Sequence, residues 1–158
     1  MRIDDILAAA SVIPVLEVER AEDAAPLARA LAAGGLRVIE LTLRTAAALE
    51  ALGEMKRAAP SLIVGMGTVR TGGDVEKSLA AGADFLVSPG AGAALVRAMA
   101  GTVALPGVAT ASEAMTAHEA GFRAMKFFPA EPAGGAAYLK SLAGPLPDIR
   151  FCPTGGIT

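Results

Sequence analysis

Short apolar runs with β-strand character alternate with alanine-rich helical runs along the whole of this 158-residue chain. This alternation constrains the fold most, because neighbouring parallel strands need crossover connections and a helix is the usual crossover. Seven runs are predicted as strands: Val12–Val18, Leu36–Leu43, Leu62–Met66, Asp84–Val87, Thr102–Leu105, Arg123–Phe128 and Ile149–Cys152. Apolar residues three or four positions apart predict helices between them, as at Leu27/Leu31, Leu49/Leu52/Met55, Val75/Leu79 and Ala111/Met115. The chain is therefore predicted to be an α/β protein with a parallel sheet.

Three of the predicted helices end in a similar Ala-Gly sequence, at Ala33-Gly34-Gly35, Ala81-Gly82 and Ala120-Gly121. A glycine just past a helix commonly takes the left-handed conformation that ends it, and the chain then enters the next strand. The repetition indicates one helix-to-strand unit used several times.

Two architectures fit such a sheet. An open doubly wound sheet normally carries a glycine-rich dinucleotide loop after its first strand, but the first strand here runs into Glu17-Val18-Glu19-Arg20. A closed barrel instead places its chemistry at the carboxyl ends of several strands, which is where the polar residues of this sequence fall. We therefore predict a (β/α)8 TIM barrel, with residues 1–158 as a single domain.

The length adds one expectation about this barrel. A complete barrel of this type usually needs roughly 200 residues or more, and Thr158 comes just after the seventh predicted strand. We expect either that the eighth β/α unit is absent from this chain, which makes the domain C-terminally incomplete, or that the molecule closes differently.

Charge and residue counts exclude several function classes. Fourteen Lys and Arg against 16 Asp and Glu give a net charge of −2, which offers no basic surface to nucleic acid. One cysteine and one histidine supply neither an internal disulfide nor a histidine-rich metal site, so no metal is expected. The chain has no apolar stretch long enough to span a bilayer and no signal-type N-terminus, so we expect a cytoplasmic protein with no membrane partner.

Lys126 is unusual among the lysines, because it falls inside the apolar strand Ala124-Met125-Lys126-Phe127-Phe128-Pro129, whereas Lys56, Lys77 and Lys140 fall in helical patterns. Burial there would desolvate the ammonium group and favour the neutral amine. Such a lysine is either a paired structural charge or an amine nucleophile for a carbonyl. Its place near the carboxyl end of a strand favours the nucleophile.

The second predicted strand continues as Val38-Ile39-Glu40-Leu41-Thr42-Leu43-Arg44-Thr45. Period-two alternation sends Glu40, Thr42 and Arg44 to one face and the aliphatic residues between them to the other. In a barrel the polar face would point toward the axis. Glu40 is then a candidate general acid/base and Arg44 a candidate carboxylate clamp, with an internal ion pair or edge-exposed charges as the alternative.

Two further strand ends carry candidate binding groups. The third strand ends Val64-Gly65-Met66-Gly67-Thr68, where Thr68 offers a hydroxyl and an amide. The seventh ends Phe151-Cys152-Pro153-Thr154-Gly155-Gly156, whose consecutive amides could cradle a phosphate.

One further polar segment and the single cysteine have structural explanations. Thr110-Ala111-Ser112-Glu113 has the pattern of a capping box that opens a helix. Cys152 is expected to be a small core residue, since no base is identifiable beside it.

Five ordered segments resemble the Schiff-base aldolases that cleave 2-keto-3-deoxy-6-phosphogluconate (KDPG), often with 4-hydroxy-2-oxoglutarate (KHG) as a second substrate. They are Glu40-Leu41-Thr42-Leu43-Arg44-Thr45, Gly65-Met66-Gly67-Thr68-Val69, Ser88-Pro89-Gly90, Lys126-Phe127-Phe128-Pro129-Ala130-Glu131 and Phe151-Cys152-Pro153-Thr154-Gly155-Gly156-Ile157. Five blocks in order, from the second strand onward, make this resemblance specific.

The resemblance implies a class I aldolase, a carbon–carbon lyase of the Entner–Doudoroff pathway with no cofactor. In it Lys126 forms the Schiff base and Glu40 acts as acid and base, while the substrate-binding residues are Arg44, Thr68, Pro89, Phe128, Thr154, Gly155 and Gly156. Among these, Arg44 and Thr68 hold the pyruvyl carboxylate, and Gly155 and Gly156 bind the phosphate. The implied ligands are pyruvate and a phosphorylated 2-keto-3-deoxy sugar acid, and the implied assembly is a homotrimer.

Other functions stay open at this point. One alternative is a 2-keto-3-deoxy-6-phosphogalactonate aldolase, from the related galactonate-type enzymes. A phosphate-binding barrel isomerase or epimerase would use carboxylate and histidine chemistry without Lys126. A non-catalytic truncated barrel or assembly scaffold would carry an exposed sheet edge.

Overall fold

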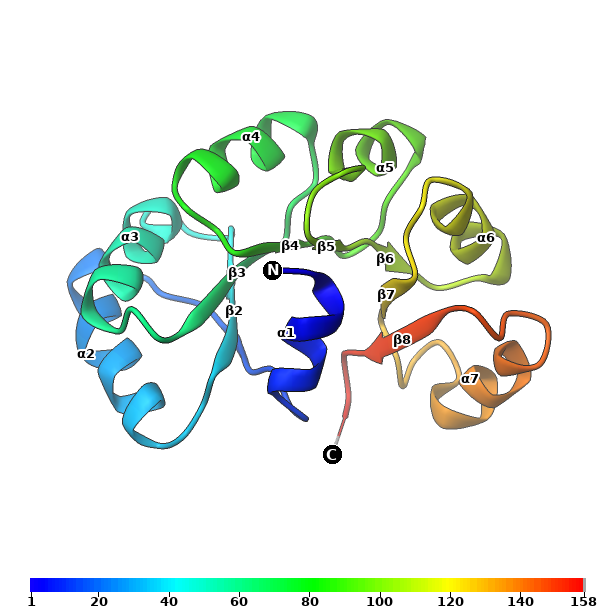
Figure 1. The fold of residues 1–158 in the computed structure, drawn as a ribbon, viewed down its shortest axis with the longest axis horizontal. Helices are drawn as coiled ribbons and strands as arrows, with labels where there is room; N and C mark the ends of the chain where they lie inside the picture. The colour runs from blue at the N-terminus through cyan, green and yellow to red at the C-terminus, as the bar shows by residue number, and fades with distance from the viewer. Residues whose placement is uncertain (158) are drawn as a thin grey trace.

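The computed structural model describes residues 1–157, and Thr158, the last residue of the predicted domain, lies outside them. Parallel strands form an arc with helices on its outer side, and the first helix lies inside the curve (Figure 1). The helices are α1 (Ile3–Ala9), α2 (Ala21–Ala33), α3 (Ala48–Ala58), α4 (Gly72–Ala80), α5 (Ala93–Met99), α6 (Ala111–Glu119) and α7 (Gly135–Ala143). The strands are β1 (Val15–Leu16), β2 (Val38–Thr42), β3 (Ile63–Gly67), β4 (Phe85–Val87), β5 (Ala104–Leu105), β6 (Gly107–Val108), β7 (Ala124–Phe127) and β8 (Arg150–Pro153).

The strands form two parallel ladders, in the orders β1-β2-β3-β4-β5 and β6-β7-β8. Only Pro106 separates β5 from β6, and because proline has no amide hydrogen it interrupts the hydrogen-bond ladder there. The amide of Lys126 still donates to the Pro106 carbonyl at 3.0 Å. The two ladders therefore follow one curve from β1 to β8, the arrangement of a TIM-type α/β barrel.

All seven predicted strands occur, with shifted limits. The run Val12–Val18 pairs only at Val15 and Leu16, and the fifth strand continues past Pro106 as β6. Helix α1 was not predicted, although Ile3, Ile6 and Leu7 have helical spacing.

The helix-to-strand joints use the predicted glycine turn. In each joint an amide reaches back five residues, from Leu36 to Leu31, from Ala83 to Ser78, and from Phe122 to Ala117. The first joint differs from the prediction in one detail, because Gly34 stays right-handed with φ of −74° while Gly35 takes the left-handed φ of 90°.

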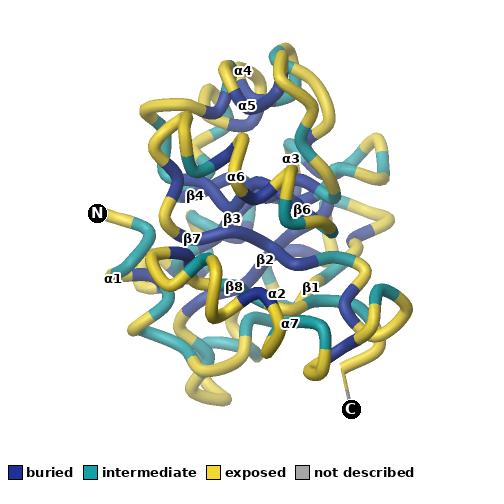
Figure 2. The backbone as a smooth tube through the Cα atoms, turned by 90° about the vertical axis from the view of Figure 1, so that its right-hand side faces the viewer, coloured by how far each residue is buried: buried dark blue, intermediate teal, exposed yellow. Residues whose placement is uncertain are grey.

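The two faces of the sheet bury different partners. Ile39 and Leu41 of β2 pack in the large core under the outer helices, and strands β2 to β7 form the buried centre of the molecule (Figure 2). On the inner face Ile6 of α1 packs against a second cluster that includes Val38, Phe85 and Ala124, each the first residue of its strand. Helix α1 therefore covers the inner side of the sheet at the amino ends of these strands.

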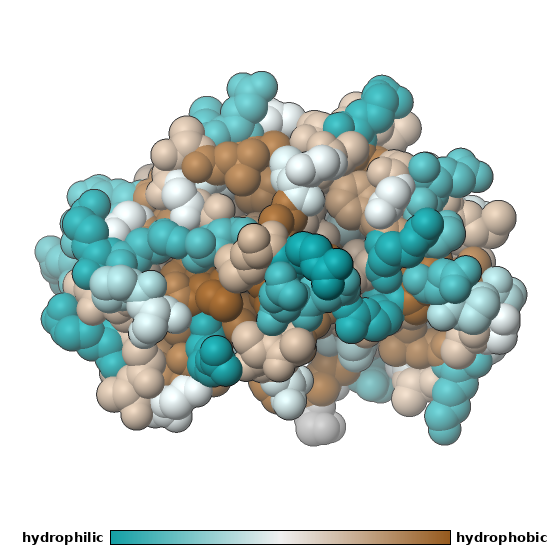
Figure 3. Space-filling model, in the orientation of Figure 1, coloured by the Kyte–Doolittle hydropathy of each residue, from teal (hydrophilic) through white to brown (hydrophobic). Residues whose placement is uncertain are grey.

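The surface around α1 is mixed. Hydrophilic side chains gather over the centre of the face that α1 occupies, and hydrophobic ones show beside it (Figure 3). No helix within residues 1–157 is long and apolar enough to cross a membrane.

The predicted capping box at the start of α6 is confirmed. Glu113 Oε2 accepts hydrogen bonds from the amides of Ala109 at 2.8 Å and Thr110 at 2.9 Å, and the Thr110 hydroxyl accepts from the Glu113 amide. The bond from the Ala109 amide is the main reason that the pKa of Glu113 lies below its ordinary value.

We predict that Glu113→Gln lowers the free energy of unfolding at neutral pH by about 0.5 kcal/mol, since a neutral amide is a weaker acceptor than a carboxylate. Because the folded-state pKa of Glu113 is lowered, its contribution is present above the pKa of the unfolded chain, about 4.3, and is lost as the pH falls through the folded-state pKa. Urea unfolding at neutral pH and in acid measures the difference. Glu76→Gln, which alters an exposed carboxylate in α4, is the control, and a Glu113→Gln deficit that persists in acid would contradict the prediction.

Candidate active site

Lys126 and Glu40 form a buried ion pair inside the curve of the sheet. Lys126 extends from β7 and Glu40 from β2, and Lys126 Nζ lies 3.2 Å from Glu40 Oε1. Their side chains are only 8% and 7% exposed. The predicted inward direction of Glu40 is thus confirmed. The charged pair lies between β2 and β7, two strands that are otherwise largely apolar.

Phe128 lies next to this pair. Lys126 Nζ is 5.4 Å from the centroid of the Phe128 ring, within reach of a cation–π interaction. The same ring lies over Gly155, where a Cβ would stand 3.3 Å from it. Phe128 therefore links the lysine to the glycine turn after β8.

The Gly155-Gly156 turn is held by the segment after β7. The Ala130 amide donates to the Thr154 carbonyl at 2.8 Å, and the Glu131 amide donates to the Gly155 carbonyl at 3.0 Å. Both glycines are left-handed, with φ of 100° and 77°. Within residues 1–157 no hydrogen bond uses the amides of Gly155 and Gly156, so these two donors are available to an anion.

Arg44 and Thr68 meet at the carboxyl ends of β2 and β3. Arg44 Nε donates to Thr68 Oγ1 at 3.2 Å. Thr68 has φ of 60°, a conformation that costs a non-glycine residue about 1 kcal/mol or more and that is concentrated at functional sites. The two residues form a polar pair of the kind that can hold a carboxylate.

Pro89 follows β4 at the same end of the barrel. Its position is fixed by Ser88, whose buried hydroxyl accepts a hydrogen bond from the Gly107 amide at 2.9 Å. Pro89 itself is partly exposed.

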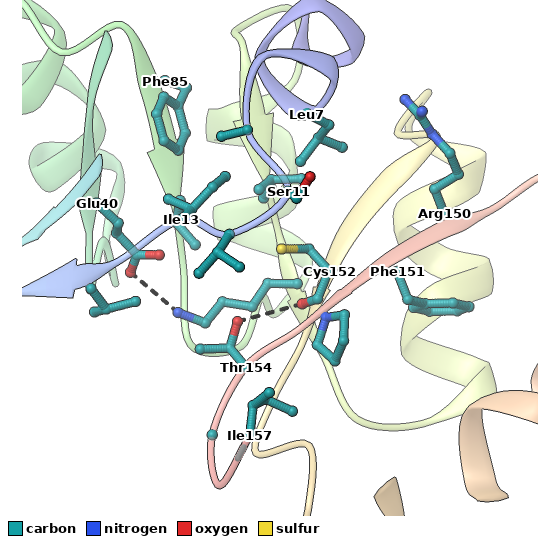
Figure 4. A pocket seen from close by; sticks show the side chains of 18 of the residues that line it. Leu7, Ser11, Ile13, Glu40, Phe85, Arg150, Phe151, Cys152, Thr154 and Ile157 are labelled. Carbon is teal, nitrogen blue, oxygen red and sulfur yellow. Dashed lines mark hydrogen bonds and ion pairs between the residues drawn. The ribbon is translucent and has the colours of Figure 1, made fainter. Parts of the chain in front are cut away.

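A cavity of about 600 Å³ lies inside the arc and extends to the segment before β1. Five of the predicted site residues line it: Glu40, Lys126, Thr154, Gly155 and Gly156. Arg44, Thr68, Pro89 and Phe128 lie outside this lining. Figure 4 shows the Glu40 carboxylate directed toward its ion-pair partner. It also shows Thr154, which lies directly after β8.

Two residues near the site were not predicted as part of it. Cys152 packs against the inner core cluster, as expected, and also lines the cavity. Its sulfur faces inward while Phe151 points away (Figure 4). Burial raises the pKa of the Cys152 thiol, and the nearby Glu40 carboxylate raises it further, so the thiol stays neutral. Glu17, at the end of β1, lies 3.5 Å from Arg44 Nη1, a contact between distant segments that carries no signal in the sequence.

In the described part of the chain, no three His, Cys, Asp or Glu side chains are grouped so that they could hold a metal ion.

Similar proteins share both the sequence and the fold. The family model described as "KDPG and KHG aldolase" matches residues 3–158. The chain is 48% identical over 157 residues to the 2-dehydro-3-deoxy-phosphogluconate aldolase of Dickeya dadantii (strain 3937). The aligned segment covers 98% of this chain and 74% of that protein.

Two solved structures superpose closely. The 2-keto-3-deoxy-6-phospho-gluconate aldolase of Zymomonas mobilis ATCC 29191 has a TM-score of 0.96 and 46% identity, covering 100% of this chain and 77% of the other. The KDPG aldolase of Legionella pneumophila, with pyruvate captured at low pH as a covalent carbinolamine intermediate, has a TM-score of 0.95 and 44% identity, covering 99% and 77%.

We predict that Lys126→Met destabilises the fold by about 3 kcal/mol, because it leaves the Glu40 carboxylate buried without its partner. The double variant Lys126→Met/Glu40→Gln should recover most of this loss, since neither charge then remains. Urea unfolding of both single variants, the double variant and the parent chain forms the double-mutant cycle. A double variant no more stable than Lys126→Met would contradict the prediction.

Proposed function

As a member of the KDPG and KHG aldolase family, the chain is an aldolase, a carbon–carbon lyase, and we propose that it cleaves KDPG to pyruvate and glyceraldehyde 3-phosphate through a Schiff base on Lys126. The observation that carries this proposal is the pairing of a buried strand lysine with a carboxylate 3.2 Å away at the wall of a cavity. An amine in apolar surroundings is suited to attack a carbonyl, and a carboxylate within hydrogen-bond reach can move the protons that the attack requires.

The proposed substrate lies across the inner face with its two anionic ends at opposite sides of Lys126. Arg44 and Thr68 bind the carboxylate next to the ketone, since a guanidinium and a hydroxyl at 3.2 Å from each other can both donate to it. The amides of Gly155 and Gly156 bind the phosphate, supported by the consecutive left-handed backbone and by the absence of hydrogen bonds from these amides within residues 1–157. Phe128, Thr154 and Pro89 are proposed to contact the substrate between these ends.

The proposed chemistry starts when Glu40 takes a proton from the Lys126 ammonium, which leaves a neutral amine. Nζ attacks the C2 ketone, and Glu40 returns the proton as the carbinolamine loses water. The product is a protonated imine, which acts as an electron sink. Glu40, directly or through a water, takes the proton from the C4 hydroxyl while the C3–C4 bond breaks and its electron pair passes into an enamine. Glyceraldehyde 3-phosphate leaves, the enamine is protonated at C3, and hydrolysis of the imine releases pyruvate and restores the amine.

We extend the proposal to KHG, which would give pyruvate and glyoxylate by the same steps. The family description, which names both substrates, supports this extension. A cytoplasmic homotrimer is proposed as the working form, and the molar mass in solution tests the trimer.

The chain should trap pyruvate on one lysine. Incubation with pyruvate and sodium borohydride is expected to reduce the imine to a stable secondary amine, which intact mass spectrometry detects as a single pyruvyl-sized adduct. Lys126→Ala should form none, whereas Lys77→Ala, which removes a lysine from the exposed surface of α4, should react like the parent chain. Folded parent chain without an adduct would overturn the Schiff-base proposal.

The distance between Glu40 and Lys126 should control turnover. A Cβ at Gly67 would overlap the Glu40 carboxylate, so Gly67→Ala is expected to push that carboxylate away and lower kcat for KDPG cleavage about 10-fold or more, as for loss of a general base. Gly72→Ala is the matched control, because a Cβ there would lie 3.6 Å from Ala98 Cβ, an ordinary contact. Assays coupled to pyruvate release measure both, and equal kcat values would refute the proposed role of Glu40.

A further inference from the structure

Glu17 and Arg44 form an ion pair at the carboxyl ends of β1 and β2, with 3.5 Å between Glu17 Oε2 and Arg44 Nη1. Resting on the proposed function, we propose that Glu17 is a positioning residue for the carboxylate end of the substrate. It holds the Arg44 guanidinium in the orientation in which Nε meets Thr68.

The backbone around Glu17 is fixed on both sides. The Thr42 hydroxyl donates to the Leu16 carbonyl at 3.0 Å, and the Thr45 hydroxyl donates to the Val18 carbonyl at 2.7 Å. The two threonines lie on either side of Arg44 in the sequence, and the two residues whose carbonyls they bind lie on either side of Glu17. The segment that carries the carboxylate and the turn that carries the guanidinium are thus fastened together at two points.

The guanidinium is held from two sides. Its Nε donates to Thr68 Oγ1 at 3.2 Å, and its Nη1 faces Glu17 at 3.5 Å. Arg44 is 54% exposed, so without these two acceptors its long side chain would sample many rotamers. Within residues 1–157 the Nη2 hydrogens have no hydrogen-bond partner, which leaves donors on an oriented fork for an incoming carboxylate.

A positioning role for Glu17 predicts a change in carboxylate binding and no change in the chemical step. Loss of Glu17 should weaken the capture of a carboxylate because the guanidinium must then be ordered by the substrate itself. The chemical step should not change, because Glu17 has no contact with Lys126 or Glu40 among the described hydrogen bonds and ion pairs. The expected loss is about two- to fivefold, the range for an exposed ion pair.

The test uses pyruvate as the probe, because it presents the carboxylate end without a phosphate. The rate of borohydride trapping is measured against pyruvate concentration for the parent chain and the variants. Glu17→Ala should raise the half-saturating pyruvate concentration about two- to fivefold with an unchanged rate at saturation, and Glu17→Gln should raise it less because its amide oxygen still accepts. In an Arg44→Ala background, Glu17→Ala should have no further effect.

Glu19→Gln is the matched control, because it removes the same charge from an exposed position two residues along the segment. A lower half-saturating concentration in Glu17→Ala would mean that Glu17 competes with the substrate for Arg44, and would overturn the proposal. An equal rise in Glu19→Gln, or no change in Glu17→Ala, would overturn it as well. Absence of saturable trapping in the parent chain would instead defeat the proposed function, and this inference with it.

Discussion

The ion pair between Lys126 and Glu40 is the interaction on which the site depends. Either charge alone would be costly at this depth, since both side chains are more than nine-tenths buried. Each is tolerated because the other lies 3.2 Å away, and they can meet only because the curve of the sheet brings β2 opposite β7 (Figure 1). The curvature of the parallel sheet, set by the repeated strand and helix units, thus has a direct chemical consequence.

The rest of the molecule keeps that geometry in place. Helix α1 fills the inner side of the sheet at the amino ends of the strands, where Ile6 is fully buried, so the opposite, carboxyl ends are left for ligands. There the strand ends are tied together in pairs: β1 to β2 through Thr42 and Thr45, and β7 to β8 through the bonds to Thr154 and Gly155. The proposed carboxylate and phosphate positions each lie beside one of these ties.

Much of this follows from the sequence, and the exceptions have a physical pattern. The strands, the capping box at Glu113 and the inward direction of Glu40 depend on local periodicity, which a sequence displays. Helix α1 was not predicted because it spans only 7 residues, too few for a helix that is stable by itself, and depends on the packing of Ile6 inside the barrel. The role argued for Glu17 depends on a contact with Arg44 across 27 positions, which periodicity does not encode. Cys152 packs against the inner core cluster, as expected, but the cavity beside it was not predicted, because apolar neighbours in a strand do not reveal one.

The central claim is that Lys126 carries the substrate carbon while Arg44 and Thr68 hold its carboxylate. A crystal structure of the chain grown with pyruvate tests both parts together. The account predicts continuous electron density from Lys126 Nζ to C2 of pyruvate, with the carboxylate within hydrogen-bond distance of Arg44 and Thr68. Pyruvate bonded to a different lysine, or bonded to Lys126 with its carboxylate directed away from Arg44, would contradict it.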